Sequence, residues 1–377
     1  MLTGVVVLDF SLQLPGPYAT MLLYTFGARV IRVEPPQGDP ARLFDPVMVE
    51  TLEAGKEHIT LDLRVEAARQ IVYRLAERSD VVVEGFRPGV ADRLGIGYDA
   101  LRARRSDTIY CSISGFGQTG PYRSIPGHDI NYLGVGGGLS AAEHQSLDAI
   151  GIPVIDLATG TAAAFLIAAA LRERELTGRG RYLDVAMLDS AIFWSAIKTH
   201  HGSAGDTRSG DRGEEPTYGV FRAQDGKRLT MAVLEDKFWA RLCVALEWTD
   251  WHRSGELAEY AQRRTRGSEI ASRLHRTIAS HPRDYWLRRL WEADIPVAPV
   301  NSLDEVPTDP QVIERHLFRE TRDGHHRLRV PLACDPVGIS PTPAPVRTSA
   351  DMRSALLNEL GYDKAAQVEL ETLGVFG

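Results

Sequence analysis

Residues 5–33 read VVVLDFSLQLPGPYATMLLYTFGARVIRV, and this stretch decides the fold class. The apolar run at 5–10 predicts a buried strand, 18–26 predicts a helix, and 29–33 predicts a second strand. Pro15-Gly16-Pro17 marks the end of the first strand. The same alternation continues along the first third of the chain, at 65–76, 81–83 and 108–112. Strands that alternate with helices form parallel sheets, so the sequence predicts an α/β, Rossmann-like fold.

A second, smaller domain is predicted after a polar segment at 200–216 that is rich in Gly, Ser, Asp and Arg. Before that segment, 159–175 is Ala-rich and helical in pattern, and we assign it to the first unit. After it, the strand-like runs 218–222 and 228–233 flank Gln224-Asp225-Gly226-Lys227, which is typical of a β-hairpin. The hairpin and the helical stretches that follow predict an α+β domain.

The composition argues against several classes of protein. The chain has 377 residues and a formal net charge of −7, which gives no electrostatic reason to expect a nucleic-acid or anionic-membrane partner. Its three cysteines are far apart and lack a C-x-x-C spacing, so neither a disulfide framework nor a zinc site is expected. The N-terminus has no basic signal region, and no apolar run approaches the ~18 residues that span a bilayer. We therefore expect a cytoplasmic protein with no membrane partner.

A nicotinamide or flavin dehydrogenase is one alternative for the first unit. The pyrophosphate of such a dinucleotide normally binds at a G-x-G-x-x-G turn and the helix that follows it. That fingerprint is absent after the strand at 5–10, so we discount NAD and FAD. The pairs His200-His201 and His325-His326 look like metal ligands, but neither has a third ligand at helical spacing, and no metal is expected.

Several short motifs occur in order along nearly the whole chain. They are VLDF (7–10) with PGP (15–17), GARVIRVE (27–34), LDLR (61–64), EGFRPG (84–89), DRLG (92–95), GFGQTGPY (115–122), GHDINY (127–132), TGRG (177–180) and IPVAPV (295–300). Each motif alone is weak. Together they resemble the family III coenzyme A transferases and α-methylacyl-CoA racemases, the group named after carnitine CoA-transferase and bile-acid-inducible protein F.

The resemblance implies an interlocked homodimer, in which both chain ends build a large Rossmann-like domain and a smaller domain threads through the partner. It implies a large CoA-binding domain at 1–195, a linker at 196–215, a small α+β domain at 216–310, a second linker at 311–335 and a return to the large domain at 336–377. It also implies an acyl-CoA thioester substrate. Coenzyme A is then part of the substrate, and no tightly bound cofactor is expected.

Coenzyme A carries phosphates and an adenine, which need cations and an open groove. By resemblance, the candidate binding residues are Leu61, Arg64, Gly85, Phe86, Arg87 and Arg93. The arginines would contact the phosphates, and the other three would line the path of the pantetheine and the adenine. The alternative for each arginine is a solvated salt bridge on the surface.

A racemase must remove the carbon-2 proton on one face and deliver a proton on the other, so two acid/base groups must flank that carbon. By resemblance, His128 and Asp156 occupy these positions, in loop-like segments just before helices. The backbone N–H of Asp129, at a helix start, would donate to the enolate oxygen. Glu235 would orient His128, as the third member of a triad orients its base.

Two further functions remain as alternatives. A transferase of the same group uses the Asp as a nucleophile, which becomes a mixed anhydride and then an aspartyl-CoA thioester. His128, Glu235 and Leu14 favour the racemase, whereas the absence of a Gly-rich stretch after Asp156 departs from racemases. The third possibility is a non-catalytic acyl-CoA binder.

Asp156 also has a purely structural alternative, as the cap of a helix that starts near Thr159. The acyl group cannot be read from the motifs. We expect its specificity to come from the loop after Ile155, the polar segment 200–216, residues 143–146 and the partner chain.

Overall fold

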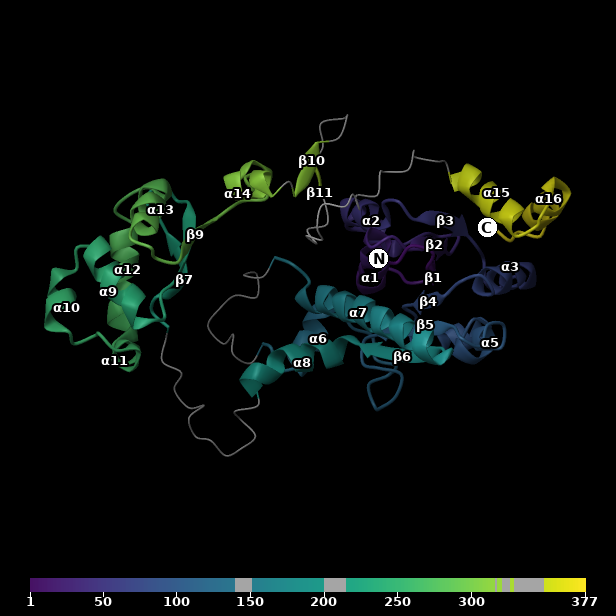
Figure 1. Cartoon of the computed structure of the whole chain (residues 1–377), viewed down its shortest axis with the longest axis horizontal. Helices are drawn as coiled ribbons and strands as arrows, with labels where there is room; N and C mark the ends of the chain where they lie inside the picture. The colour runs from purple at the N-terminus through teal and green to yellow at the C-terminus, as the bar shows by residue number, and fades with distance from the viewer. Residues whose placement is uncertain (140–150, 200–214, 316, 321–325, 329–348) are drawn as a thin grey trace. The chain divides into compact units, whose positions relative to one another are not determined.

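The computed structural model describes residues 1–139, 151–199, 215–315, 317–320, 326–328 and 349–377. These residues belong to two compact units, one built from residues 1–200 and 327–377 and the other from 201–326 (Figure 1). Each unit has a hydrophobic core of its own.

The first unit is built on a six-stranded parallel sheet in the order β3-β2-β1-β4-β5-β6. Its strands are β1 (Val6–Asp9), β2 (Arg29–Glu34), β3 (Glu57–Thr60), β4 (Val81–Glu84), β5 (Ile109–Ser114) and β6 (Arg181–Ala186). The strand order reverses between β1 and β4, and open α/β sheets bind ligands at such a switch point, outside the carboxyl ends of the strands. The predicted α/β fold with a Rossmann-like parallel sheet is confirmed.

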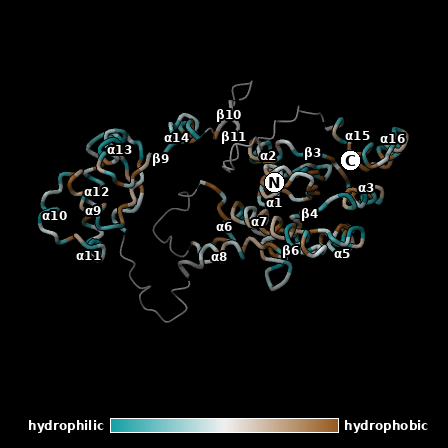
Figure 2. Tube along the Cα trace, viewed as in Figure 1, coloured by the Kyte–Doolittle hydropathy of each residue, from teal (hydrophilic) through white to brown (hydrophobic). Residues whose placement is uncertain are grey.

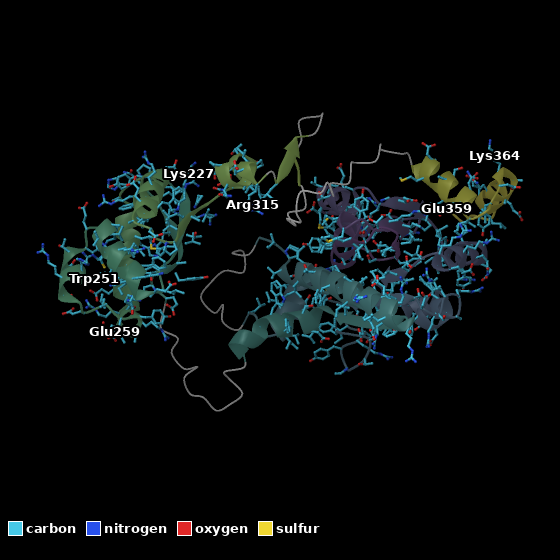
Figure 3. All side chains as sticks on the ribbon, viewed as in Figure 1. Lys227, Trp251, Glu259, Arg315, Glu359 and Lys364 are labelled. Atoms are coloured by element: carbon cyan, nitrogen blue, oxygen red, sulfur yellow. The ribbon has the colours of Figure 1, made fainter. Side chains whose placement is uncertain are left out.

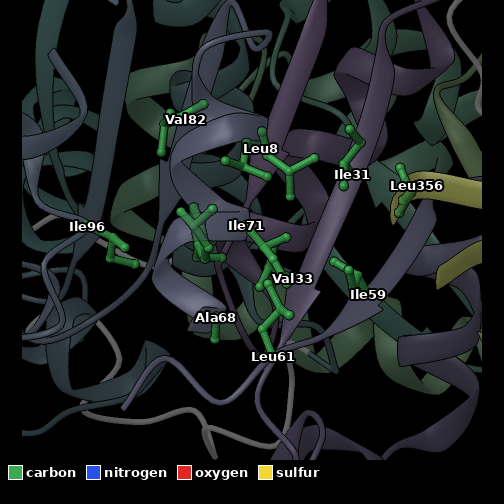
Figure 4. Close-up of a cluster of buried hydrophobic side chains, with 14 of the residues drawn as sticks. Leu8, Ile31, Val33, Ile59, Leu61, Ala68, Ile71, Val82, Ile96 and Leu356 are labelled. Carbon is green, nitrogen blue, oxygen red and sulfur yellow. The ribbon is translucent and has the colours of Figure 1, made fainter. Parts of the chain in front are cut away.

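Helices cover both faces of this sheet. They are α1 (Pro15–Thr25), α2 (Pro46–Glu53), α3 (Glu66–Ala76), α4 (Val90–Arg93), α5 (Tyr98–Arg102), α6 (Asp129–Val135), α7 (Val154–Thr177), α8 (Met187–Thr199), α15 (Ser349–Glu359) and α16 (Lys364–Thr372). Successive strand residues point to opposite faces. Val7 therefore lies in a cluster with residues of α1 and α7, whereas Leu8 lies in a cluster with residues of α3 and α15 (Figure 4).

Helix α3 illustrates why these segments are helical. Its buried residues are Ala68, Ile71, Val72, Leu75 and Ala76, which lie on one face of a 3.6-residue period. Most of the other positions are charged or polar, so the trace in Figure 2 changes repeatedly between teal and brown along such helices.

The C-terminal segment 349–377 belongs to the first unit. Leu356 and Leu360 are buried in the core on the α3 face of the sheet. Glu359, labelled in Figure 3, accepts from Arg29 of β2, with Nη2 and Oε2 2.7 Å apart. The N–H of Asp62 donates to the carbonyl of Val375 at 2.8 Å. The end of the chain thus completes the sheet's cover beside β2 and β3.

The second unit has an antiparallel sheet in the order β7-β8-β9. Its elements are β7 (Tyr218–Arg222), β8 (Arg228–Ala232), β9 (Val297–Val300), α9 (Asp236–Ala245), α10 (Thr249–Ser254), α11 (Tyr260–Thr265), α12 (Gly267–Ile278), α13 (Arg283–Glu292) and α14 (Pro310–Glu314). Two short strands that pair with each other, β10 (Phe318–Glu320) and β11 (His326–Leu328), follow at the boundary between the two units. Trp239, Trp248 and Trp251 pack together in its core. Lys227, labelled in Figure 3, pairs with Glu305 at 2.8 Å.

Helix α7 corrects one statement made from the sequence. It is the one helix among the described residues that is long and apolar enough, by length and composition, to cross a membrane, so an apolar run of that size does exist. Ala163 and Ile167 of this helix are fully buried in the core of the first unit. The core helix of a globular protein meets the same criterion, and the expectation of no membrane partner stays a prediction.

A close approach between α1 and α7 depends on Gly160. A Cβ atom at this position would lie 2.6 Å from the carbonyl oxygen of Pro15 and 2.8 Å from Cδ1 of Tyr18. The first of these atoms is backbone and cannot turn aside. The absence of a side chain at Gly160 therefore sets the distance between the two helices.

We predict that Gly160→Ala destabilises the protein by about 1–3 kcal/mol through overpacking. This loss of stability is opposite in sign to the usual effect of a Gly→Ala substitution in a helix, because Ala in a helix is otherwise about 1 kcal/mol more favourable than Gly. Urea denaturation of both proteins measures the difference. Gly134→Ala in α6 is the matched control, since its Cβ would meet only Leu139 Cδ1 at 3.7 Å. Equal stability of Gly160→Ala and the wild type would contradict this reading.

Candidate active site

A buried ion network fixes the loop between β1 and α1 at the switch point. Arg32 is fully buried and pairs with Asp39 (Nη2–Oδ2 2.9 Å) and Asp9 (Nη1–Oδ2 3.4 Å). Asp9 also accepts from the hydroxyl of Thr20 at 2.6 Å, and Asp39 accepts from the N–H of Gln13 at 2.9 Å. Gln13 has a φ of 68°, which is strained for a residue with a side chain. The carboxylates therefore hold a strained turn in place.

A pocket of about 260 Å³ opens beside this loop, at the carboxyl ends of β1 to β4. It is lined by Phe10, Val33, Glu34, Pro35, Pro36, Gln37, Leu61, Asp62, Leu63, Arg64, Phe86 and Leu94. Three of the predicted binding residues, Leu61, Arg64 and Phe86, are among them. The other nine were missed, although each lies on or just after a buried strand or beside the 84–95 motifs, which is where this topology places a ligand.

The predicted residues Gly85, Arg87 and Arg93 are not among those that line the pocket. Gly85 follows β4 and faces the β1–α1 loop, since a Cβ there would lie 3.5 Å from Cβ of Ser11. Arg93 ends α4, and Nη1 of Arg93 lies 3.6 Å from the Cβ position of Gly89. Their contribution to binding stays a prediction.

Each charged residue that lines the pocket takes part in an ion pair. Arg64 binds Asp62, with Nη2 and Oδ2 2.7 Å apart, while the Arg64 side chain is 74% exposed. This is the solvated salt bridge that was the alternative for each arginine, and it leaves the guanidinium at the rim. Glu34, at the end of β2, accepts from Arg42 at 2.8 and 3.1 Å. Glu34 is thus not free to bind a ribose as the acidic residue of a dinucleotide site does.

The second group of predicted residues meets where α6 and α7 begin. Oδ1 of Asp129, the first residue of α6, accepts from the backbone N–H groups of Ile155 (2.6 Å) and Asp156 (3.0 Å) in α7. His128 directly precedes α6 as its N-cap residue, and its backbone N–H donates to Oδ1 of Asn131 at 2.9 Å. The fold therefore brings Asp129 into contact with Asp156, and His128, which is exposed, directly precedes Asp129 in the chain.

Asp156 is not where the sequence predicted it. Helix α7 begins at Val154, with Pro153 as its N-cap residue, rather than near Thr159. Asp156 is therefore the third residue of the helix and not a loop residue or a helix cap. Pro153 carries no side-chain acceptor, so no capping residue in the sequence indicated a helix start at this point.

The surroundings of Asp156 bring the pKa of its carboxyl close to neutral pH. Burial and, next, the nearby Asp129 raise the pKa of Asp156 to about 7. A carboxyl with such a pKa is matched to proton transfer at neutral pH. Tyr132 of α6 lies in the same region, and its pKa is raised to about 12 by burial and by Asp156, while Arg87 acts in the opposite direction. Arg87 thus acts electrostatically at this junction although it does not line the pocket.

Glu235 lies in the second unit, as the N-cap residue of α9, where its carbonyl accepts from Phe238 at 3.0 Å. The two units are described separately, and a contact between Glu235 and His128 stays a prediction. Residues 143–146, His200, His201 and His325 lie outside the described residues. Among the residues that are described, no group of three His, Cys, Asp or Glu side chains is placed to hold a metal ion.

Comparison with known proteins agrees with the order of motifs in the chain. The family model of CoA-transferase family III matches residues 2–351. The chain belongs to CoA-transferase family III. Members of this family act on acyl-CoA thioesters, and this chain is a family III acyl-CoA enzyme.

Relatives of this family III enzyme include proteins with both activities considered above. It is 32% identical to acetyl-CoA:oxalate CoA-transferase of Acetobacter aceti, over 84% of each chain. It is 30% identical to α-methylacyl-CoA racemase of Homo sapiens, over 92% of this chain and 86% of the relative. The crystal structure of a CaiB/BaiF family protein from Brucella suis aligns with a TM-score of 0.83 and 28% identity, covering 95% of this chain and 99% of that one.

For this family III enzyme, we predict that Asp156→Asn raises stability at high pH. The folded state raises the pKa of Asp156 from an ordinary 3.8 to about 7, so wild-type stability is fully present below pH 3.8 and falls as the pH rises to about 7. Asn does not ionise and avoids that loss. Urea unfolding at pH 8 should show a gain of roughly 1–3 kcal/mol, allowing for partial exposure of the side chain, and a much smaller gain near pH 4. A difference that does not change with pH would refute the assignment.

Proposed function

We propose that this enzyme racemises or epimerises carbon-2 of a 2-methylacyl-CoA by proton transfer between Asp156 and His128. The observation that carries the proposal is the partly buried Asp156 carboxyl, whose pKa is raised to about 7 next to Asp129 and near the N-cap residue His128. Such a carboxyl exists in both its acid and its base form at neutral pH. Racemisation needs each acid/base group in both forms, because the two enantiomers are deprotonated from opposite faces.

In the proposed reaction, the Asp156 carboxylate takes the carbon-2 proton, and the electron pair of the C–H bond delocalises onto the thioester oxygen. The His128 imidazolium then returns a proton to carbon-2 on the opposite face. Both groups reset by exchange with water, and the other enantiomer reacts in the reverse order. The backbone N–H of Asp129 has no acceptor within α6, because it belongs to the first turn, and would donate to the enolate oxygen. Glu235 would orient His128.

We further propose that the coenzyme A moiety binds along the edge from the pocket to the α6–α7 junction. Leu61 and Phe86 line the pocket with apolar surface suited to the adenine, and Arg64 lies at its rim. Arg64 would exchange Asp62 for a phosphate, since guanidinium binds either group in the same bidentate geometry. Gly85, Arg87 and Arg93 follow β4 and would continue the path. Coenzyme A is part of the substrate in this account, and no tightly bound cofactor is proposed.

A CoA-transferase is the second candidate, and the names of the relatives favour it, since the acetyl-CoA:oxalate enzyme of Acetobacter aceti is a transferase. Asp156 would then attack the thioester, form a mixed anhydride and release the CoA thiolate, which attacks the aspartyl carbonyl to give an aspartyl-CoA thioester and the free acid. A pKa near 7 leaves a large share of the Asp156 carboxyls ionised at neutral pH, so it is compatible with this role as well. The third candidate, a non-catalytic binder, requires an unreachable Asp156, and Asp156 is only partly buried.

We predict that His128→Ala and Asp156→Ala each slow exchange of the carbon-2 proton by about 100- to 10,000-fold, the usual contribution of one acid/base group. Proton NMR of 2-methylacyl-CoA in D2O, without an added carboxylic acid, measures the exchange. His252→Ala in the second unit is a control for loss of an exposed histidine. Exchange that is unaffected by either active-site variant would refute the two-base reaction. A hydroxylamine-trapped adduct at Asp156, without exchange, would establish the transferase instead.

We also propose an interlocked homodimer. Helices α7 and α8 carry large apolar side chains that are exposed in the single chain, namely Phe165 (72%), Leu176 (70%), Phe193 (77%) and Trp194 (56%). Exposed large apolar side chains gathered on two neighbouring helices suggest an interaction surface, and a second copy of this chain is the partner that the family resemblance implies.

We predict that light scattering after size-exclusion chromatography gives twice the chain mass of 41.6 kDa. Phe193→Asp should shift the equilibrium toward the monomer or lower the yield of folded protein, because a charge would be buried at the interface. Val368→Asp on α16 is the matched control, since Val368 is also exposed (61%) but lies on another face of the first unit. A wild-type monomer would rule out the proposed dimer.

A further inference from the structure

The start of α7 is capped by a residue of another helix. An N-cap side chain normally accepts from the N–H groups of the second and third helical residues. In α7 the N-cap residue is Pro153, which has no acceptor, and the second and third residues are Ile155 and Asp156. Oδ1 of Asp129 in α6 accepts from both of these N–H groups, at 2.6 and 3.0 Å. Asp129 of α6 therefore caps the N-terminus of α7.

This capping has an electrostatic consequence for Asp156. The positive end of a helix normally favours the charged form of an acidic residue in its first turn. Here the Asp129 carboxylate occupies that end, uses the N–H groups and adds a negative charge. Partial burial makes an acidic residue resist ionisation, and the neighbouring like charge of Asp129 adds to the effect. The local geometry thus reverses what a first-turn Asp would otherwise experience.

No other described carboxylate acts on Asp156 in the same way. From α6, Tyr132 interacts electrostatically with Asp156 and with Arg87, which follows β4, and His128 is the N-cap residue of that helix. Tyr18 of α1 and Leu157 of α7 pack against the same small apolar cluster. The acid of α8, Asp189, is influenced by Asp184. Asp129 is the anion whose charge acts directly on Asp156 among the described residues.

We propose that Asp129 is a positioning residue whose carboxylate keeps both the protonated and the ionised form of Asp156 populated at neutral pH. This role is separate from any role of the Asp129 backbone N–H. This inference rests on the proposed function, in which Asp156 must both take and give a proton. The Asp129 carboxylate acts through Asp156 and not on the substrate. It holds the first turn of α7 and supplies the charge that makes proton uptake by Asp156 favourable when carbon-2 is deprotonated.

The variant Asp129→Asn separates the charge from the capping. The amide oxygen of Asn still accepts hydrogen bonds at a helix start, so the junction stays folded while the negative charge is lost. We expect the titration midpoint of the Asp156 carboxyl to fall by about one pH unit or more. The acid limb of the rate–pH profile for carbon-2 proton exchange should move to lower pH by the same amount.

Two measurements detect the expected shift in the titration of Asp156. Carbon-13 NMR of protein labelled at the aspartate carboxyls reports the midpoint directly, and the Asp156 signal is the one that disappears in Asp156→Asn. Carbon-2 exchange in D2O gives the rate–pH profile. Asp363→Asn is the matched control, because Oδ1 of Asp363 likewise caps a helix, accepting from the N–H of Ala366 at 2.9 Å at the start of α16. The control should leave both the midpoint and the profile unchanged.

The outcomes distinguish this proposal from the proposed function. An unchanged midpoint in folded Asp129→Asn would overturn the proposal even if the enzyme racemises its substrate. A lowered midpoint in an enzyme without carbon-2 exchange would support the role of Asp129 and reject the racemase. If Asp129→Asn does not fold, Asp129→Ser provides a second neutral cap, and the same shift is expected and the same absence of a shift would refute it.

Discussion

The geometry of the site depends on a fully buried cation, Arg32. Removing one partner from a buried ion pair typically costs about 3–5 kcal/mol, so Arg32 must keep its carboxylates close. Its partners Asp9 and Asp39 hold the strained β1–α1 turn at the switch point of the sheet. That turn positions α1, and α1 packs against Gly160 of α7 at a distance that admits no side chain. The position of α7, and with it the position of Asp156, therefore depends on the buried charges of Arg32, Asp9 and Asp39.

At the α6–α7 junction, one contact holds two helices together and, in the proposed function, also affects the chemistry. The Asp129 carboxylate ties the two helices together and places a negative charge beside Asp156. Burial of Asp156, and next the charge of Asp129, make Asp156 ionise less readily than in the unfolded chain, and this lowers the stability of the folded protein at neutral pH. The proposed reaction would use the raised pKa of Asp156 for proton transfer, as is common for active-site carboxyls.

Much of the fold could be predicted from the sequence, because apolar runs such as 5–10 and 81–83 have few alternatives to buried parallel strands. The motifs also led to Leu61, Arg64 and Phe86, which line the pocket. The start of α7 was predicted five residues too late, since Pro153 gives no capping signal and Asp129 caps the helix from elsewhere in the chain. The Arg32 network was missed for the same reason: its partners are brought together only by the fold, and no local pattern records them.

The central claim is that two groups move a proton at carbon-2 of an acyl-CoA. Incubating the wild-type enzyme with one enantiomer of a 2-methylacyl-CoA in D2O, without any carboxylic acid, tests it most directly, with chiral chromatography and mass spectrometry as the measurements. The account predicts conversion to a mixture of both enantiomers, with deuterium at carbon-2 in the inverted product. Retention of the starting configuration without deuterium, together with CoA exchange once a carboxylic acid is added, would contradict it.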